Sequence, residues 1–151
     1  MRALDLMTPH PVIVHPSCTV GEASRLMAHL AIRHLVVVGD DGRLVGILSD
    51  RDLRGPLRHR DAPSPDPGSA ISALMSRDVV TAVPDTERSQ LVRVMSELGI
   101  SAMPVLDEDR KPIGIVSYTD VLDSFAGEER ASDDALEAMD RDEFVPHPRD
   151  P

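Results

Sequence analysis

The feature that most constrains the fold of this chain is an internal repeat at a shift of 68 residues. Residues 6–53 align on residues 74–121 without a gap, and 14 of the 48 positions are identical. Most other positions are apolar in both copies or polar in both copies. A chain that repeats itself in this way is expected to build one small unit twice. Because a unit of about 50 residues is marginally stable alone, we expect the two copies to pack on each other.

Each copy carries the same order of expected elements, β-α-β-β-α. Short β-type runs at 12–14 and 79–81 are each followed by a proline. A half-buried helix follows in each copy, with the apolar stripes Ala23, Leu26, Met27, Leu30 and Leu91, Val94, Met95, Leu98. Two hairpins are then expected, 35–38 with 44–48 and 103–106 with 113–116, followed by short helices at 50–53 and 119–125. We therefore predict an α+β (mixed α/β) fold.

Helix starts and stops fit this order. Thr19 and Glu22 have the spacing of a capping box, and Asp85 is the corresponding cap candidate in the second copy. Gly99 suits the left-handed residue that ends a helix. The predicted domains are repeat 1 over 1–58, a proline-rich and charged linker over 59–69, repeat 2 over 70–126 and an acidic tail over 127–151. A short helix around 132–139 is an alternative, but we predict that the tail is disordered.

Composition argues against several classes of function. With 26 acidic and 16 basic residues, the net charge of −10 disfavours a nucleic-acid binder, which needs clustered basic residues. The single cysteine, Cys18, can form neither an internal disulfide nor a cysteine-based metal site, which favours a reducing compartment. No apolar run approaches the length of about 20 residues that a membrane span needs. The N-terminus lacks a secretory signal, so we expect a soluble cytoplasmic protein.

The most informative motif is Gly-aliphatic-aliphatic-Ser-x-x-Asp, which occurs at 46–52 and again at 114–120. It lies where a strand ends and a helix begins, so free backbone N–H groups there favour an anion such as phosphate. The serine hydroxyl can donate to that anion, and the aspartate can accept from both hydroxyls of a ribose. Ser-x-x-Asp is also close to a capping box, and the spacing alone favours capping. The two roles can coexist.

These segments together resemble the CBS domain, and residues 4–126 are similar to a tandem CBS pair, or Bateman module. The resemblance rests on the two Gly-h-h-Ser-x-x-Asp segments, where h is aliphatic, on the strands IRHLVVV and ISAMPVL, and on the valine runs before proline. It implies pseudo-twofold symmetry and two equivalent clefts, each of which borrows strand residues from the opposite repeat. In similar modules the clefts bind AMP, ADP, ATP, S-adenosylmethionine or a dinucleotide such as NAD.

Carried over position by position, the resemblance implies a set of binding residues for each cleft. The first cleft would comprise Ile47, Ser49, Arg51, Asp52, Val80, Ile100, Ser101 and Ala102. The second cleft would comprise Ile115, Ser117, Thr119, Asp120, Val12, Ile32, Arg33 and His34. The aspartates would take ribose, the hydroxyl residues would lie near phosphate, and the aliphatic residues would sandwich adenine.

The sequence also departs from the family pattern. Val36 stands where the family often has a proline, which the second repeat keeps as Pro104. The basic residues Arg33, His34 and Arg51 all come from the first repeat, so the two clefts are expected to differ in affinity. Few cations per site favour a mono- or diphosphate over a triphosphate.

The expected function is that of a stand-alone regulatory module for energy sensing. It would bind an adenine nucleotide, most readily AMP or ADP, and signal occupancy to an unknown protein target or through a homodimer. We expect no required cofactor, no metal, no catalytic residue, no membrane and no nucleic acid. The alternative is a ligand-free structural or dimerisation module in which the aspartates only cap helices. An enzyme is a third possibility, disfavoured by the lack of a hydrolase elbow, a Walker loop or histidines at metal-ligand spacing.

Overall fold

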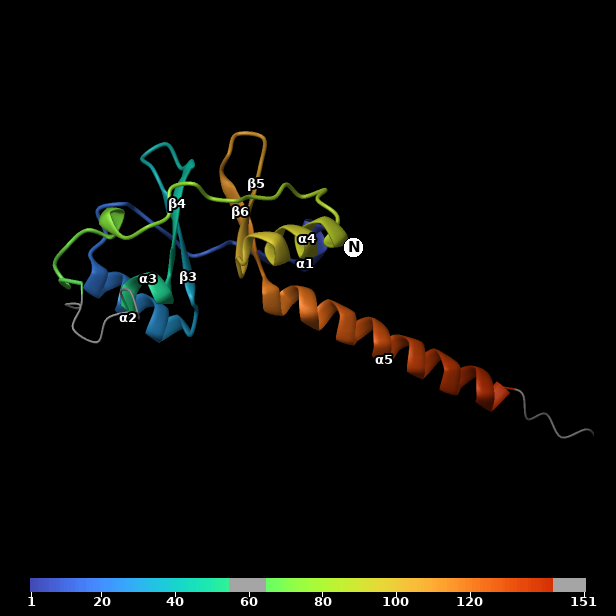
Figure 1. The fold of residues 1–151 in the computed structure, drawn as a ribbon. Coiled ribbons are helices and arrows are strands. Elements are labelled where there is room, and N and C mark those ends of the chain that lie inside the picture. Colours follow the sequence, from blue (N-terminus) through green and yellow to red (C-terminus); the bar gives the residue numbers. More distant parts are fainter. Residues whose placement is uncertain (55–64, 143–151) are drawn as a thin grey trace, which may run out of the picture.

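The computed structural model describes residues 1–54 and 65–142, and it has two β-hairpins that stand side by side (Figure 1). The first hairpin is β3 (His34–Val38) and β4 (Leu44–Ser49), and the second is β5 (Ala102–Leu106) and β6 (Pro112–Ser117). The helices are α1 (Ala3–Leu6), α2 (Val20–Leu30), α3 (Asp50–Arg54), α4 (Arg88–Leu98) and α5 (Tyr118–Asp142), with a 3₁₀ turn, η1 (Ile71–Ala73). Two short strands, β1 (Thr8–Pro9) and β2 (Ile13–Val14), complete the two sheets. The predicted mixed α/β fold is confirmed.

The elements of the second repeat follow those of the first by the same 68 residues as the sequence. Helix α2 begins at Val20 and α4 at Arg88, and the two hairpins begin at His34 and Ala102. The same shift relates the pair Val14–Val37, between β2 and β3, to the isolated bridge between Ala82 and Val105. The duplication in the sequence is therefore a duplication in the structure. The β-type run expected at 79–81 forms no strand, and the bridge lies just after it, at Ala82.

Each sheet receives its outermost segment from the other copy. Strand β1 belongs to the first repeat by sequence, yet it pairs antiparallel with β6 of the second, with Thr8 opposite Ile115. In the reciprocal contact, Ser76 of the second repeat bridges to Ile47 on β4. Two backbone hydrogen bonds between Ser76 and Ile47, 2.9 and 3.0 Å long, hold that bridge.

The buried cores follow this exchange. Ala3, next to β1, is buried with Leu91 and other residues of the second copy, and Ile71 and Met75 are buried with residues of the first. We call the part built on β3 and β4, with residues 69–76, the first unit, and the part built on β5 and β6, with residues 1–9, the second unit. The ranges predicted for the two repeats, 1–58 and 70–126, mark the copies in the sequence, and each unit also takes a segment from the other copy.

A third core joins the two units. Val36, Val38 and Leu44 of the first hairpin are buried together with Leu106 of the second. The backbone N–H of Leu44 also donates to the carbonyl of Arg110, 3.1 Å away, so the two hairpins touch near their turns. The expectation that the repeats pack on each other is met by this shared apolar layer between the sheets.

The helices differ from expectation at their ends. Leu30 and Leu98 belong to the predicted buried stripes, yet they are 44% and 58% exposed, because both occupy the last helical position. Helix α4 begins at Arg88 with Glu87 as its N-cap, not Asp85, and Asp85 instead pairs with Arg2 at 3.0 Å. Gly99 does end α4 in the left-handed region, with φ 63°.

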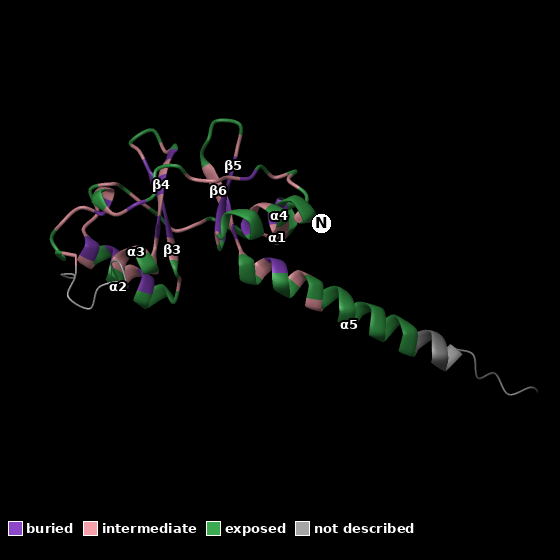
Figure 2. Cartoon of the chain, in the orientation of Figure 1, coloured by how far each residue is buried: buried purple, intermediate pink, exposed green. Residues whose placement is uncertain are grey.

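The tail also differs from expectation. Helix α5 continues to Asp142, and most of its length beyond the second unit is exposed (Figure 2). Arg88 anchors its base, because the guanidinium lies 4.0 Å from the Phe125 ring centroid and 2.9 Å from the Glu128 carboxylate. The acidic composition after Gly127 predicts disorder, whereas this anchor comes from Arg88, which lies far away in the sequence. The predicted linker residues 59–64 and tail residues 143–151 lie outside the described part of the chain. None of the described helices is long and apolar enough to cross a membrane.

Candidate functional site

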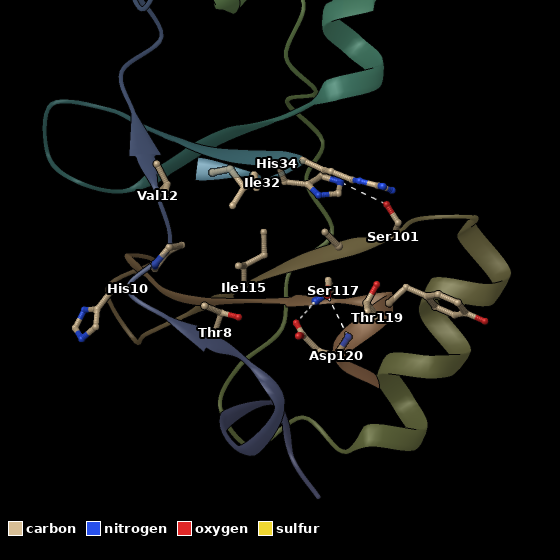
Figure 3. Close-up of a pocket in the computed structure, with 15 residues that line it drawn as sticks. Thr8, His10, Val12, Ile32, His34, Ser101, Ile115, Ser117, Thr119 and Asp120 are labelled. Carbon is tan, nitrogen blue, oxygen red and sulfur yellow. Dashed lines mark hydrogen bonds between the residues drawn. The ribbon is translucent and has the colours of Figure 1, made fainter. Parts of the chain in front are cut away.

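A cavity of about 480 Å³ opens between the two units and is lined by both of them (Figure 3). Its volume falls in the range of about 300–1,000 Å³ that is typical of small-molecule sites. All eight residues predicted for the second cleft line it, namely Val12, Ile32, Arg33, His34, Ile115, Ser117, Thr119 and Asp120. The structure therefore brings together side chains that lie as far apart in the sequence as Val12 and Asp120.

The loop between β6 and α5 presents the polar groups of the cavity. The backbone N–H of Ser117 donates to Asp120 Oδ2 at 2.8 Å, and the backbone N–H of Asp120 donates to Ser117 Oγ at 3.1 Å. This reciprocal pair confirms the capping interpretation of Ser-x-x-Asp. The two side chains can still form hydrogen bonds with a ligand while they cap the helix. A carboxylate has about four acceptor sites, and a hydroxyl that accepts a bond still has a proton to donate.

The apolar part of the cavity has two facing walls. Val12 and Ile32 lie on the wall that comes from the first unit, and Ile115 points towards them from the second unit (Figure 3). Ile32 follows directly on Ala31, the left-handed C-cap of α2, and its backbone N–H donates to the carbonyl of Met27 at 3.0 Å. Ile115 is fixed by its pairing with Thr8. The cavity therefore has apolar side chains on two opposite walls.

The basic groups of the cavity lie where β3 begins. Arg33 is exposed, and His34 is half-buried with its Nε2 3.4 Å from the hydroxyl of Ser101. Burial lowers the pKa of His34 below its ordinary value of 6.5, although the nearby Asp50 and Asp52 act in the opposite direction. The His34 ring is therefore neutral near pH 7 and lies beside the hydroxyl that bridges the two units.

The residues predicted for the first cleft are only partly gathered. Ser101 and Ala102 line the same cavity as the second-cleft residues. Ser49 and Asp52 form a cap with the same lengths as its counterpart, 2.8 and 3.1 Å. The other four lie apart from that cavity: Ile47 pairs with Ser76, Val80 and Ile100 pack against the core of the second unit, and Arg51 is exposed. Their joint role as a second binding site stays a prediction.

The cavity is also lined by five residues that were not predicted from the sequence. They are Thr8, His10, Pro11, Ala31 and Tyr118. Thr8 could have been identified from the repeat, because Ser76, another hydroxyl residue, stands at the equivalent position. His10 had none, because its place at the cavity depends on a left-handed backbone conformation, with φ 54°.

The charged groups of the described residues show no metal-binding arrangement. Within residues 1–54 and 65–142, histidine, cysteine and carboxylate side chains nowhere gather in threes in a way that could hold a metal ion. Asp50, which is close to Asp52 in the sequence, pairs instead with Arg54 at 2.6 Å.

Comparison with known proteins agrees with the family resemblance found in the sequence. A family model for the CBS domain matches residues 3–58 and 71–127, which confirms the resemblance seen in the sequence. The magnesium transporter MgtE of Thermus thermophilus is 33% identical over 149 residues, which are 95% of this chain and 31% of that protein. The chain spans only 23% and 24% of the length of two other curated relatives.

Two solved structures have similar folds. The CBS domain pair of protein MJ0100, in complex with 5′-methylthioadenosine and S-adenosyl-L-methionine, has a TM-score of 0.75 and 29% identity, covering 85% of this chain and 98% of that one. The cytosolic domain of the Mg²⁺ channel MgtE, in complex with ATP, has a TM-score of 0.69 and 34% identity, covering 82% of this chain and 48% of that one.

Proposed function

The chain belongs to the CBS domain family, and from that premise we propose that it is a regulatory module that binds an adenosine-containing ligand between its two units. The observation that carries the proposal is the convergence of eight predicted residues on one cavity of about 480 Å³. The similar structures with bound methylthioadenosine, S-adenosylmethionine and ATP support the ligand class. AMP or ADP is the preferred ligand, and ATP, S-adenosylmethionine and NAD are the others to test.

The proposed pose follows from the chemistry of the lining. Adenine lies between Ile32 and Ile115, whose side chains face each other across the cavity (Figure 3). The Asp120 carboxylate accepts from the two ribose hydroxyls while it still caps α5. Ser117 and Thr119, with the backbone N–H groups at the start of α5, then receive the 5′ substituent.

The charge of the cavity favours a short phosphate chain. Arg33 is the one lysine or arginine among its lining residues, and the Asp120 carboxylate opposes it. The His34 ring, neutral when the cavity is free, can take up a proton when a phosphate arrives, since a nearby anion raises the pKa of an imidazole. One arginine and one such histidine match one or two phosphate groups better than three.

Occupancy can be transmitted because the cavity touches a long element. Tyr118, Thr119 and Asp120 form the first turn of α5, which then leaves the second unit (Figure 1). A ligand shifts the balance between two arrangements of α5 only as far as it binds one of them better. The receiver is a cytoplasmic partner protein or a second copy of this chain. The equivalent loop with Ser49 and Asp52 provides a second, weaker site that shares Ser101 and Ala102.

The alternative function is a ligand-free structural or dimerisation module. The reciprocal caps at Ser49–Asp52 and Ser117–Asp120 favour it, because each explains the Ser-x-x-Asp pattern without any ligand. The two functions differ in whether the Asp120 carboxylate contributes to binding as well as to stability.

The test is calorimetric titration of the protein with AMP, ADP, ATP, S-adenosylmethionine and NAD, together with thermal unfolding in each. A ligand at 100 times its dissociation constant adds about 2.7 kcal/mol to the free energy of unfolding. In Asp120→Asn the amide oxygen can still cap, but the charged acceptor for ribose is lost. Because a hydrogen bond to a charged group contributes about 1.5–3 kcal/mol, affinity should fall about 10- to 150-fold.

Glu22→Gln is the matched control. Glu22 holds the same position in the capping box of α2, where it accepts from the backbone N–H of Thr19 at 3.1 Å, and it does not line the cavity. Its affinity for AMP should equal that of the wild-type protein. If none of the five ligands binds, the structural alternative replaces the proposal. Wild-type affinity in Asp120→Asn would place any bound ligand outside this cavity.

A further inference from the structure

The ligand cavity lacks positive charge for a phosphate. Arg33 is the one lysine or arginine among its described lining residues, and the Asp120 carboxylate lies in the same cavity. A phosphate monoester brings up to about two negative charges near pH 7, so the cavity would then hold about three negative charges with Asp120. The single charge of Arg33 offsets only part of this excess, which favours any nearby group that can become cationic.

His34 is the lining residue best placed to become cationic. The lining residues that become cationic by gaining a proton are His10 and His34. Figure 3 shows the His10 ring pointing away from Asp120, whereas the His34 ring lies across the cavity from Ser117 and Thr119. A phosphate held by Ser117 and Thr119 would therefore face His34.

Ser101 connects His34 to the beginning of α5. The Nε2 atom of His34 lies 3.4 Å from Ser101 Oγ. The backbone N–H of Tyr118, the first residue of α5, donates to the carbonyl of Ser101 at 2.8 Å. These two contacts place the imidazole near the helix end that receives the 5′ phosphate in the proposed pose. At such short range the charge of the phosphate acts strongly on the imidazole.

The surroundings keep the His34 ring neutral while the cavity is free. Burial has the largest effect and lowers the pKa of His34, and the charge of Arg33 acts in the same direction. Two carboxylates of the first unit act in the opposite direction but do not outweigh burial. The charged or titratable groups around the ring are Arg33, Asp50 and Asp52 on its own unit, and His10, Tyr118 and Asp120 in the cavity lining.

We propose that His34 selects ligands by the charge of their 5′ group: it takes up a proton from solvent when a phosphate binds and stays neutral when an uncharged or cationic group binds. While the ring is neutral, the Ser101 hydroxyl donates to Nε2. Once protonated, Nε2 donates to Ser101 Oγ, and the hydroxyl proton is then free to bond a phosphate oxygen. This inference rests on the proposed function and adds the residue that chooses among adenosine ligands.

Proton uptake makes the choice of ligand depend on pH. By linkage, AMP strengthens proton binding to His34 by the same factor by which the proton strengthens binding of AMP. With one proton taken up, the affinity for AMP should rise by at most about tenfold per pH unit as the pH falls from 8 to 7. The affinity for adenosine, which carries no phosphate, should stay level, and the sulfonium charge of S-adenosylmethionine should oppose protonation.

The first experiment follows the ring signals of His34 by NMR from pH 5.5 to 8.5. Spectra are recorded for the free protein, with saturating AMP and with saturating adenosine, and His34→Gln identifies the signals. The midpoint of the titration should move to higher pH with AMP and stay in place with adenosine. The same midpoint in AMP and in adenosine overturns the proposal.

The second experiment counts protons by calorimetric titration with AMP at pH 7.5 in buffers of different ionisation enthalpy. The wild-type protein should show net proton uptake. His34→Gln should show none and should bind AMP about tenfold more weakly, because a hydrogen bond to a charged group is lost. Unchanged affinity for adenosine in this variant shows that the cavity is intact.

His29→Gln is the matched control, because His29 is exposed on α2 and does not line the cavity. It should take up protons as the wild-type protein does. Uptake that persists in His34→Gln, or that is lost in His10→Gln instead, overturns the proposal. Binding of AMP without proton uptake refutes this inference alone, whereas failure of every adenosine ligand to bind refutes the proposed function as well.

Discussion

Gly114→Ala tests the close contact between β1 and β6, which also positions the cavity residues Thr8 and His10. Gly114 is buried on β6, opposite Pro9 of β1, and it opens the second Gly-h-h-Ser-x-x-Asp motif. A methyl group added there would lie 2.8 Å from Met7 Cγ and 3.0 Å from Met7 Cβ. These distances are too short for carbon atoms, so Met7 and the adjoining β1 would have to move. Thr8 and His10, which line the cavity, would move with them.

The size of the effect follows from this overlap. Extra methyl groups in a packed interior cost about 1–3 kcal/mol, so the free energy of unfolding should fall by that amount. Each kcal/mol corresponds to about 2–4 °C in melting temperature for a chain of this size. Met7→Ala removes the two nearest colliding atoms, Sδ and Cγ, and leaves only Cβ at 3.0 Å. Alone it costs about 2 kcal/mol or less, since Met7 is half-buried.

The assay is urea unfolding of the wild-type protein, the two single variants and the double variant. Because Met7→Ala makes room for the new methyl group, the double variant should be more stable than the sum of the single effects predicts, by about 1–3 kcal/mol. Gly127→Ala is the control, since an added methyl there meets nothing within 4 Å in helix α5. It should stabilise the protein by about 1 kcal/mol.

Two outcomes would refute this reasoning. A Gly114→Ala variant as stable as the wild-type protein would mean that β1 does not approach β6 as closely as the structure has it. Additive effects in the double variant would mean that Met7 is not the side chain that requires a glycine. The same cycle at Gly46 and Met75, where the new methyl would lie 2.7 Å from the Met75 sulfur, checks the reciprocal contact.

Two further predictions concern the helix ends and pH. Ala31 and Gly99 occupy equivalent C-caps with φ 52° and 63°, so Ala31→Gly should raise and Gly99→Ala should lower the free energy of urea unfolding, each by about 1 kcal/mol; changes of the same sign would contradict this. Because burial lowers the pKa of His34, the stability that its neutral form contributes is complete above pH 6.5 and is lost as the pH falls through the lowered pKa. Between pH 7.5 and 5 the free energy of unfolding should therefore fall more steeply for the wild-type protein than for His34→Gln. His29→Gln, at an exposed histidine, is the control and should follow the wild-type curve. Parallel curves for wild type and His34→Gln would show that His34 makes no such contribution.

Much of the site could be predicted because its parts are local. The Ser117–Asp120 cap depends on residues three apart, and the alternation of β6 fixes which side Ile115 takes. The partner wall with Ile32 was predicted from the resemblance to the CBS domain, which implies that each cleft borrows strand residues from the opposite repeat. The cap and the strand alternation are local features of the sequence, whereas the pairing of the two walls rested on the resemblance; the structure brings these residues to one cavity.

What could not be predicted depends on contacts between distant segments. Thr8 could pair with either hairpin as far as its own sequence shows, since both β4 and β6 offer a glycine to the preceding methionine. The choice of β6 is made by packing, with Ala3 buried against the second unit. The contact of Arg88 with Phe125 at the base of α5 likewise joins distant segments, and no local pattern reveals it.

The most direct test of the central claim is a crystal structure of the protein grown with AMP. We expect electron density for adenine between Ile32 and Ile115, with both ribose hydroxyls within hydrogen-bond distance of the Asp120 carboxylate. Density for AMP elsewhere on the protein, or a cavity filled by side chains at saturating AMP, would contradict it.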